Sequence, residues 1–165
     1  MTIKVGDRIP TGVLKELGPA GAPTVVSSAE IFAGKRIVLF SCPGAFTPKS
    51  TQQQVPSYLN HADEIISLGV DAIVCISVND AFVMDAWGKA CGVGDKIRML
   101  ADGHCEFHTS MGLEMDCTRF TLGFRNQRFS MIVDDGVVTH LNVEEPGGYA
   151  VSDASIIVEQ LRQAH

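Results

Sequence analysis

The chain has 165 residues, of which 45% are apolar and 19% charged, as is typical of one globular domain with a well-buried core. Nineteen acidic and thirteen basic residues give a net charge of -6, and no basic cluster is interleaved with aromatic residues, which argues against nucleic acid as a partner. The longest apolar runs, such as residues 37–40, are far too short to span a bilayer. We therefore expect a single domain over residues 1–165 with no membrane association.

The cysteine content points to a reducing compartment. Five cysteines, an odd number without C-x-x-C spacing, do not resemble the disulfide framework of a small secreted domain. The first residues have neither the apolar core of a secretory signal nor the Arg-rich face of a transit peptide. Cytoplasm is the simplest assignment, with an organelle reached through a removed presequence left open.

The first forty residues predict an irregular start and then a buried strand. Glycines and prolines interrupt residues 1–24, where we expect only a short strand near residues 11–16. Ser27 and Glu30 have the spacing of a capping box, which predicts a short helix that Gly34 ends. A continuous apolar run then predicts a buried strand over residues 36–41.

A tight loop after this strand leads into a long helix. Thr47 is a good N-cap and Pro48 suits the first helical position, so the helix is expected to start at about Pro48. Pro56 predicts a kink, and Gly69 ends the helix. The apolar positions with helical spacing are Val55, Tyr58, Leu59, Ala62, Ile65 and Ile66.

The middle of the chain predicts a second strand over residues 70–78 and a third over 97–101, with a helix between them. Asn79 or Asp80 would cap this helix and Gly92 would end it. Its apolar face is expected to carry Phe82, Val83, Ala86, Trp87 and Ala90. Met84 and Trp87 are interpreted as core residues.

Residues 102–127 are ambiguous, with a helical turn expected near 107–113 and a loop near 118–123. Asp135-Gly136 favours the turn of a hairpin between strands over 129–134 and 137–143. The last helix is expected over 153–163, with Ile156, Ile157, Val158 and Leu161 facing inward. This order of elements predicts an α/β fold with a mixed sheet flanked by helices.

Position 50 lies in the first turn of the long helix, where unpaired amides and the helix dipole stabilise a negative charge. A cysteine there would be shifted towards thiolate. The residue present is Ser50.

Three separated motifs point to a known family. They are P-G-A-F-T-P at 43–48, V-N-D-A-F-V-M-D-A-W at 78–87, and R-F-S-M at 128–131 followed by Asp135-Gly136. In this order they resemble the peroxiredoxins, in particular the type II branch, also called type V, whose loop reads P-G-A-F-T-P-x-C. The resemblance implies a thioredoxin-like fold and a thiol-dependent reduction of hydrogen peroxide and small alkyl hydroperoxides, without metal, haem or flavin.

The resemblance also implies roles for several residues. Thr47 would hydrogen-bond the peroxide, Pro43 would shield the nucleophile from water, and Gly44 and the amides of the helix start would hold the oxygens. Arg128 would lower the pKa of the nucleophilic thiol and bind substrate, because a guanidinium keeps its charge at every relevant pH. Arg125 is the competing candidate for this role.

Ser50 stands where the family has its peroxidatic cysteine. A serine hydroxyl is poorly acidic and forms no sulfenic acid, so the chain is expected to be inactive as written. Two origins are compatible with this residue: a deliberate cysteine-to-serine replacement, which we favour because the rest of the motif is intact, and a naturally silent relative.

Recycling would need a second thiol or an outside reductant. Cys75 matches the resolving cysteine of some type II members and is the internal candidate, although a buried hydrophobic role is its alternative. Other members have a resolving cysteine near the C-terminal helix, where this chain has Val151. Glutathione, glutaredoxin or thioredoxin would serve a one-cysteine cycle. Cys42 lies close to the loop, and Cys91, Cys105 and Cys117 match no motif.

The family resemblance further suggests a homodimer with Phe46 in the contact. The alternative function is a binding or regulatory protein that keeps the fold without peroxide chemistry. A metal site made by residues 104–108 with Cys117 fits no zinc spacing well. A hydrolase with Ser50 as nucleophile would need a G-x-S-x-G elbow that the flanking Lys49 and Thr51 do not supply.

Overall fold

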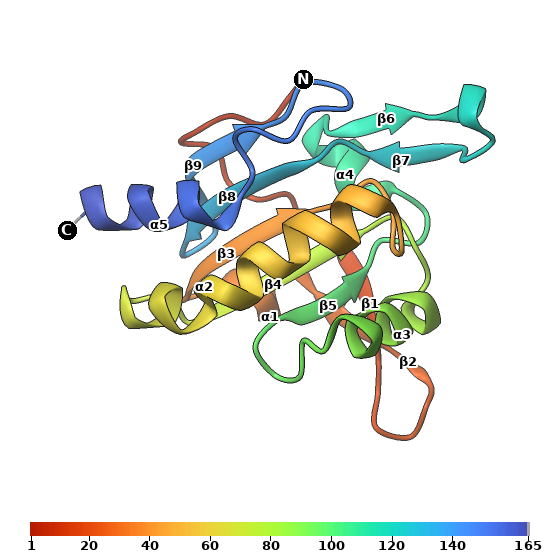
Figure 1. The fold of residues 1–165 in the computed structure, drawn as a ribbon, viewed down its shortest axis with the longest axis horizontal. Helices are drawn as coiled ribbons and strands as arrows, with labels where there is room; N and C mark the ends of the chain where they lie inside the picture. Colours follow the sequence, from red (N-terminus) through yellow and green to blue (C-terminus); the bar gives the residue numbers. More distant parts are fainter. Residues whose placement is uncertain (165) are drawn as a thin grey trace.

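The computed structural model describes residues 1–164, which form a twisted seven-stranded sheet with helices on both faces (Figure 1). The strand order is β2-β1-β5-β4-β3-β8-β9. The strands of this sheet are β1 (Val13–Leu17), β2 (Pro23–Ser27), β3 (Arg36–Ser41), β4 (Ala72–Ser77), β5 (Arg98–Ala101), β8 (Phe129–Asp134) and β9 (Val137–Val143). A separate antiparallel pair is made by β6 (Glu114–Asp116) and β7 (Phe124–Asn126).

The large sheet is mixed, as predicted. The central strands β3, β4 and β5 run parallel, whereas β8 pairs antiparallel with both β3 and β9. Parallel neighbours need crossover connections, and helices supply them here. The α/β order that the sequence predicted is therefore confirmed.

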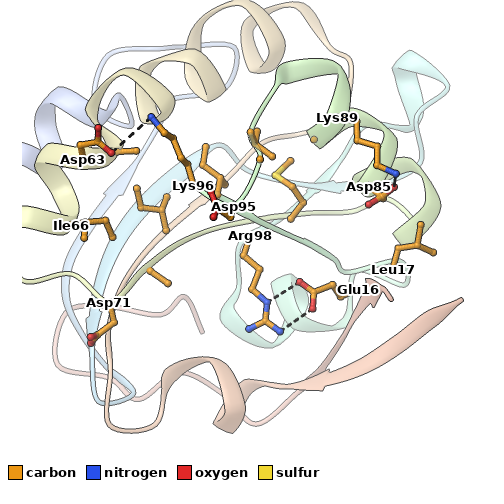
Figure 2. A pocket seen from close by; sticks show the side chains of 18 residues that line it. Glu16, Leu17, Asp63, Ile66, Asp71, Asp85, Lys89, Asp95, Lys96 and Arg98 are labelled. Atoms are coloured by element: carbon orange, nitrogen blue, oxygen red, sulfur yellow. Dashed lines mark hydrogen bonds and ion pairs between the residues drawn. The ribbon is translucent and has the colours of Figure 1, made fainter. Parts of the chain in front are cut away.

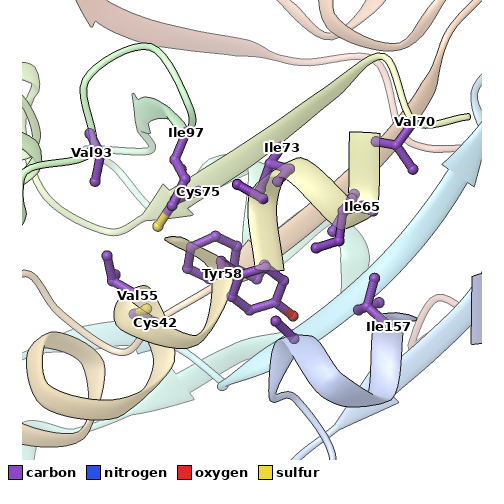
Figure 3. Packing of buried hydrophobic residues seen from close by; sticks show 14 of the residues in the cluster. Cys42, Val55, Tyr58, Ile65, Val70, Ile73, Cys75, Val93, Ile97 and Ile157 are labelled. Atoms are coloured by element: carbon purple, nitrogen blue, oxygen red, sulfur yellow. The ribbon is translucent and has the colours of Figure 1, made fainter. Parts of the chain in front are cut away.

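Two separate apolar clusters lie on the two faces of the sheet. One is covered by α2 (Val55–Ser67), α3 (Ala81–Cys91) and α5 (Ala154–Gln163), and the other by α1 (Ser28–Phe32) and α4 (Glu106–Met111). Figure 3 shows the first cluster, in which the ring of Tyr58 stacks on that of Phe40 with centroids 3.9 Å apart. No helix in the described part of the chain is long and apolar enough to cross a membrane.

Strand β3 directs its side chains alternately to these two clusters. Val38, Phe40 and the following Cys42 belong to the cluster under α2, whereas Ile37 and Leu39 belong to the other. This alternation follows from the two-residue period of a strand. It continues one residue past the end of β3, and it decides on which face Cys42 lies.

Several local predictions are confirmed. Ser27 and Glu30 form the capping box of α1, and Asp80 caps α3 through the amide of Val83. The hairpin turn has Asp135 at φ 47° and Gly136 at φ 80°, the left-handed conformations that a type I′ turn requires. Each of these features depends on residues close in sequence, and local sequence patterns therefore predicted them.

Other expectations are wrong in detail. Strand β2 was not predicted, and it pairs with β1 across a tight turn. Phe82 is 57% exposed, because the buried positions of α3 are Ala81, Met84, Trp87 and Gly88 and the apolar face is therefore rotated from the expected one. In α5, Ile156 is only half-buried. The ambiguous segment 102–127 contains α4, β6, β7 and a 3-10 turn, η2 (Thr118–Phe120).

A wider helical turn directly precedes Pro56, where a kink was expected. The helix begins at Pro48 as predicted, but residues Ser50–Gln54 (η1) are π-helical, and Pro56 lies at the start of the regular helix α2. A proline removes one helical hydrogen bond and its ring clashes with the carbonyl four residues earlier. In the π-turn before the proline, the amide of Val55 bonds the carbonyl of Ser50, five residues earlier, and such turns are frequent at functional sites.

Candidate active site

The loop between β3 and the helix is held by its own backbone and by Asn79. The amide of Ala45 donates to Asn79 Oδ1 at 2.9 Å, and the amide of Thr47 donates to the carbonyl of Gly44. Phe46 has a φ of 64° and is 54% exposed. A side chain on Gly44 would lie 3.3 Å from Thr47 Cγ2, tighter than an ordinary contact. The loop is therefore a compact turn that fixes the start of the helix.

Ser50 is completely buried at this helix start. Its Oγ lies 2.7 Å from Thr47 Oγ1 and 3.2 Å from Arg128 Nη1. Thr47 Oγ1 also lies 2.7 Å from the carbonyl of Gly44. Because a threonine hydroxyl has one proton and a carbonyl only accepts, Thr47 donates to Gly44 and accepts from Ser50. The predicted cap bond from the Thr47 side chain to the helix amides is therefore replaced by these contacts.

Sheet register brings Arg128 to this position. Ser41, the last residue of β3, pairs with Phe129 of β8, so Arg128 lies beside the start of the loop although it is far away in sequence. Its side chain is 9% exposed. The guanidinium carbon lies 6.0 Å from the centre of the Tyr149 ring, a separation at which a cation is attracted to the ring face.

Gln54 connects Arg128 to Cys42 beneath the serine. Arg128 Nη1 donates to Gln54 Oε1 at 2.5 Å, and Cys42 Sγ donates to the same oxygen at 3.2 Å. The other atom of the amide, Gln54 Nε2, is a buried donor with no hydrogen-bond partner in the described part of the chain. Buried polar groups in native proteins are nearly always paired, so this nitrogen marks a place where a small polar molecule would be held.

The two cysteines on this face of the sheet perturb each other's acidity. Burial opposes ionisation of Cys42, but the neighbouring Cys75 thiol, the charge of Arg128 and the hydroxyl of Ser50 outweigh it, so the pKa of Cys42 is lowered. Burial raises the pKa of Cys75 well above its usual value, and its neighbour Cys42 adds to this. Of the two, Cys42 is therefore the thiol that the site prepares for ionisation.

The segment that carries Tyr149 is anchored by one carboxylate. Glu144 accepts from the amides of Ala150, Val151 and Ser152 and from the hydroxyl of Ser152. These bonds lower the pKa of Glu144 against the opposing effect of burial. The anchoring keeps the aromatic ring beside Arg128.

The competing arginine has another environment. Arg125 donates to the carbonyl of Val78 at 2.9 Å and to the carbonyl of Leu122 at 3.0 Å. Its guanidinium lies against Gly44, on the outer part of the loop. Of the two arginines, Arg128 is the one that hydrogen-bonds Ser50.

A second buried polar chain lies on the opposite side of β3. Asp102 Oδ2 lies 2.7 Å from His108 Nδ1, and His108 Nε2 lies 2.7 Å from Ser41 Oγ. Asn126 Nδ2 donates to the same hydroxyl at 2.9 Å. The order carboxylate, imidazole, hydroxyl is that of a hydrolase triad, but Ser41 and His108 are fully buried and Asp102 is 3% exposed. Ser41 Oγ donates its only proton to the carbonyl of Ile76, so His108 cannot act as its base and this chain is structural.

The same segment does not form a metal site. The side chains of 104–108 that were weighed as ligands have other partners: His108 Nδ1 lies 2.7 Å from Asp102 Oδ2, and Cys105 Sγ faces the carbonyl of Arg125 at 3.6 Å. In the part of the chain that the structure describes, no group of three or more histidine, cysteine or acidic residues could hold a metal ion.

A large hollow lies elsewhere on the molecule, beneath α3 and beside β5, with a volume of about 770 Å³ (Figure 2). Its basic residues Lys89, Lys96 and Arg98 pair with Asp85, Asp63 and Glu16. Its lining contains no nucleophile or histidine. The three cations of the hollow are thus paired within its wall, which leaves an acidic excess of Asp71 and Asp95, and the thiols and hydroxyls gather around Ser50 instead.

The sequence identified Ser50, Thr47 and Arg128, which the structure brings together, and Pro43 and Gly44, which lie in the same loop. The sequence did not identify Gln54, which belongs to none of the three motifs. It placed Cys42 near the loop but did not predict that Cys42 contacts Gln54. The period of β3 could have placed Cys42 on the face under α2, and helical spacing places Gln54 one turn after Ser50.

Comparison with known proteins agrees with this site. Residues 4–158 match the family model described as Redoxin. The chain is 43% identical over 163 residues to the chloroplastic Peroxiredoxin-2E of Arabidopsis thaliana, covering 97% of this chain and 70% of the relative. It is 41% identical over 145 residues to Peroxiredoxin sll1621 of Synechocystis, covering 84% and 76%.

Solved structures give the same result. The reduced Prx3 of Vibrio vulnificus in complex with hydrogen peroxide has a TM-score of 0.93 and 46% identity, with 97% of this chain and 99% of that chain covered. Peroxiredoxin 5 of Alvinella pompejana has a TM-score of 0.87 and 35% identity, with 98% and 99% covered. The thioredoxin-like fold that the motifs implied is confirmed, and the chain belongs to the peroxiredoxin family, with relatives in its type II branch.

Proposed function

We propose that the site at Ser50 is a peroxide pocket, and that the scaffold is that of a thiol-dependent peroxidase for hydrogen peroxide and small alkyl hydroperoxides. The observation that carries the proposal is the convergence of Thr47 and Arg128 on one buried side chain at a helix start. Thr47 and the amides at Gly44 and the helix start would hold the peroxide oxygens, and Pro43 would exclude water. Arg128 would stabilise the charge that develops on the leaving oxygen.

Ser50 occupies the position of the nucleophile, but a serine cannot perform the nucleophilic attack on peroxide that a cysteine thiolate performs. A thiolate attacks one peroxide oxygen and forms a sulfenic acid, whereas a serine hydroxyl stays protonated even beside Arg128. The pocket would therefore bind peroxide without turning it over through position 50.

The test is to restore the thiol. The Ser50→Cys protein should consume hydrogen peroxide repeatedly with a dithiol or a glutathione system as reductant, while the Ser50 chain should show no turnover. A Ser50→Ala chain is the matched control, because it removes the hydroxyl without adding a sulfur. Inertness of the Ser50→Cys protein with intact fold would overturn the proposal.

Several finer properties accompany it. The reductant would be glutathione, glutaredoxin or thioredoxin, with Cys75 as the internal resolving candidate. We propose a homodimer whose contact includes the exposed Phe46 and one domain over residues 1–165. The assignment to the cytoplasm stays a proposal, since the relatives include chloroplastic and mitochondrial proteins.

A non-catalytic binding or regulatory role is the rival. It predicts that the Ser50→Cys protein is as inert as the Ser50 chain. The mutual contacts of Thr47, Ser50, Gln54 and Arg128, the last three of them buried, favour the enzyme scaffold over this rival.

A further inference from the structure

Cys42 is the thiol that hydrogen bonds connect to the Ser50 site. Its sulfur donates to Gln54 Oε1 at 3.2 Å, and the same oxygen receives Arg128 Nη1. Arg128 in turn contacts Ser50 at 3.2 Å. The guanidinium of Arg128 therefore connects Ser50, at the position of the family's nucleophile, through Gln54 to the sulfur of Cys42.

The unpartnered amide nitrogen of Gln54 is a second, independent sign that a ligand is held here. Gln54 is fully buried, and its oxygen is committed to Arg128 and Cys42, so the orientation of the amide is fixed. Its Nε2 is left as a free donor within the described part of the chain. A peroxide oxygen is an acceptor of the right size for one such donor, because hydrogen peroxide is little larger than water.

Cys75 is placed to meet Cys42. In the β3–β4 register Cys75 pairs with Phe40, two residues before Cys42, so both cysteines face the same side of the sheet. Both side chains belong to the packed cluster under α2, with Val55 between the same elements (Figure 3). A sulfur oxidised at Cys42 would have a second thiol in the same cluster, on the neighbouring strand.

We propose that Cys42 is a peroxide-reactive thiol of this chain and that Cys75 traps it as an intramolecular disulfide, in place of chemistry at residue 50. The inference rests on the proposed function, because peroxide must enter the pocket. In the first step the Cys42 sulfur attacks a peroxide oxygen; an S–O bond forms, the O–O bond breaks, and the leaving hydroxide takes up the thiol proton as water. In the second step the Cys75 sulfur attacks the sulfenic sulfur; an S–S bond forms, the S–O bond breaks, and a second water leaves.

The reaction runs once per chain. Both sulfurs lie inside the packed cluster under α2, whereas residue 50 adjoins the part-exposed Thr47, so a reductant that reaches position 50 does not reach the closed disulfide. The Ser50 chain therefore shows no turnover, but it records exposure to peroxide as the loss of two of its five thiols.

The experiment treats the full chain with hydrogen peroxide, alkylates the remaining thiols under denaturing conditions, and counts them by intact mass with peptide mapping. The expected result is three alkylated cysteines and a peptide linked through Cys42 and Cys75. Cys75→Ser should stop at a sulfenic acid on Cys42 that dimedone captures. Arg128→Gln should slow the loss of the Cys42 thiol by about tenfold or more, the effect of one pKa unit.

Cys91→Ser is the matched control and should form the disulfide as the parent does. Cys91 is more exposed than Cys42, so accessibility alone would oxidise it first. The inference is overturned if Cys42 remains alkylatable after other cysteines are oxidised, or if both Cys42→Ser and Cys42→Ala lose as many thiols as the parent. If the Ser50→Cys protein still turns over peroxide in that case, only this inference fails. If the Ser50→Cys protein is also inert, the proposed peroxide pocket is wrong.

Discussion

Removing the guanidinium of Arg128 should raise the pKa of a cysteine placed at position 50. In the Ser50→Cys background, Arg128→Met keeps most of the length of the side chain but deletes its charge. A positive charge stabilises the thiolate relative to the thiol, so its loss makes the proton harder to remove. The direction of the shift follows directly from the contact between Arg128 and residue 50.

The magnitude follows from the separation of Arg128 Nη1 and Ser50 Oγ, which is 3.2 Å. With an effective dielectric constant of about 20, two unit charges at this distance interact by about 5 kcal/mol. Since one pKa unit corresponds to about 1.36 kcal/mol, about four units is the upper limit. Water entering the vacated space would solvate the thiolate, so we expect a rise of about two to three units.

The assay is the pH dependence of iodoacetamide alkylation, followed on the peptide that contains residue 50 so that Cys42 is counted separately. Arg125→Met in the same background is the control, because Arg125 bonds to the carbonyls of Val78 and Leu122 and should leave the pKa nearly unchanged. A pKa in the Arg128→Met protein equal to that of its parent would refute the electrostatic role of Arg128.

Two further predictions concern stability and assembly. The hydrogen bonds from His108 outweigh burial and lower the pKa of Asp102, so its stabilising contribution is present above the unfolded value of about 4 and is lost as pH falls through the folded value. Asp102→Asn should therefore lower the free energy of unfolding by about 1–3 kcal/mol at pH 7 and flatten its decline towards acidic pH in urea titrations; an unchanged pH profile would contradict this. Phe46→Glu should convert a dimer to monomers in sedimentation equilibrium, whereas Val25→Glu, at a residue of similar exposure, should not; a dimer that persists in the Phe46→Glu variant would exclude Phe46 from the contact.

Local sequence patterns determined most of the elements of this protein. The apolar run of β3, the Asp135-Gly136 turn and the capping box at Ser27 were all predicted, because each depends on residues within a few positions of one another. The motif around Ser50 likewise identified the family and the helix start.

Tertiary structure alone decided what surrounds that serine. Arg128 reaches Ser50 because β8 pairs with β3 in one register, and a shift of one residue would turn its side chain to the other face. The contact of Gln54 with both Arg128 and Cys42 depends on the π-turn, and the chain of Asp102, His108 and Ser41 joins α4 to the far face of β3. Such contacts join segments far apart in sequence, and their geometry is set by packing and sheet register, which no local pattern contains.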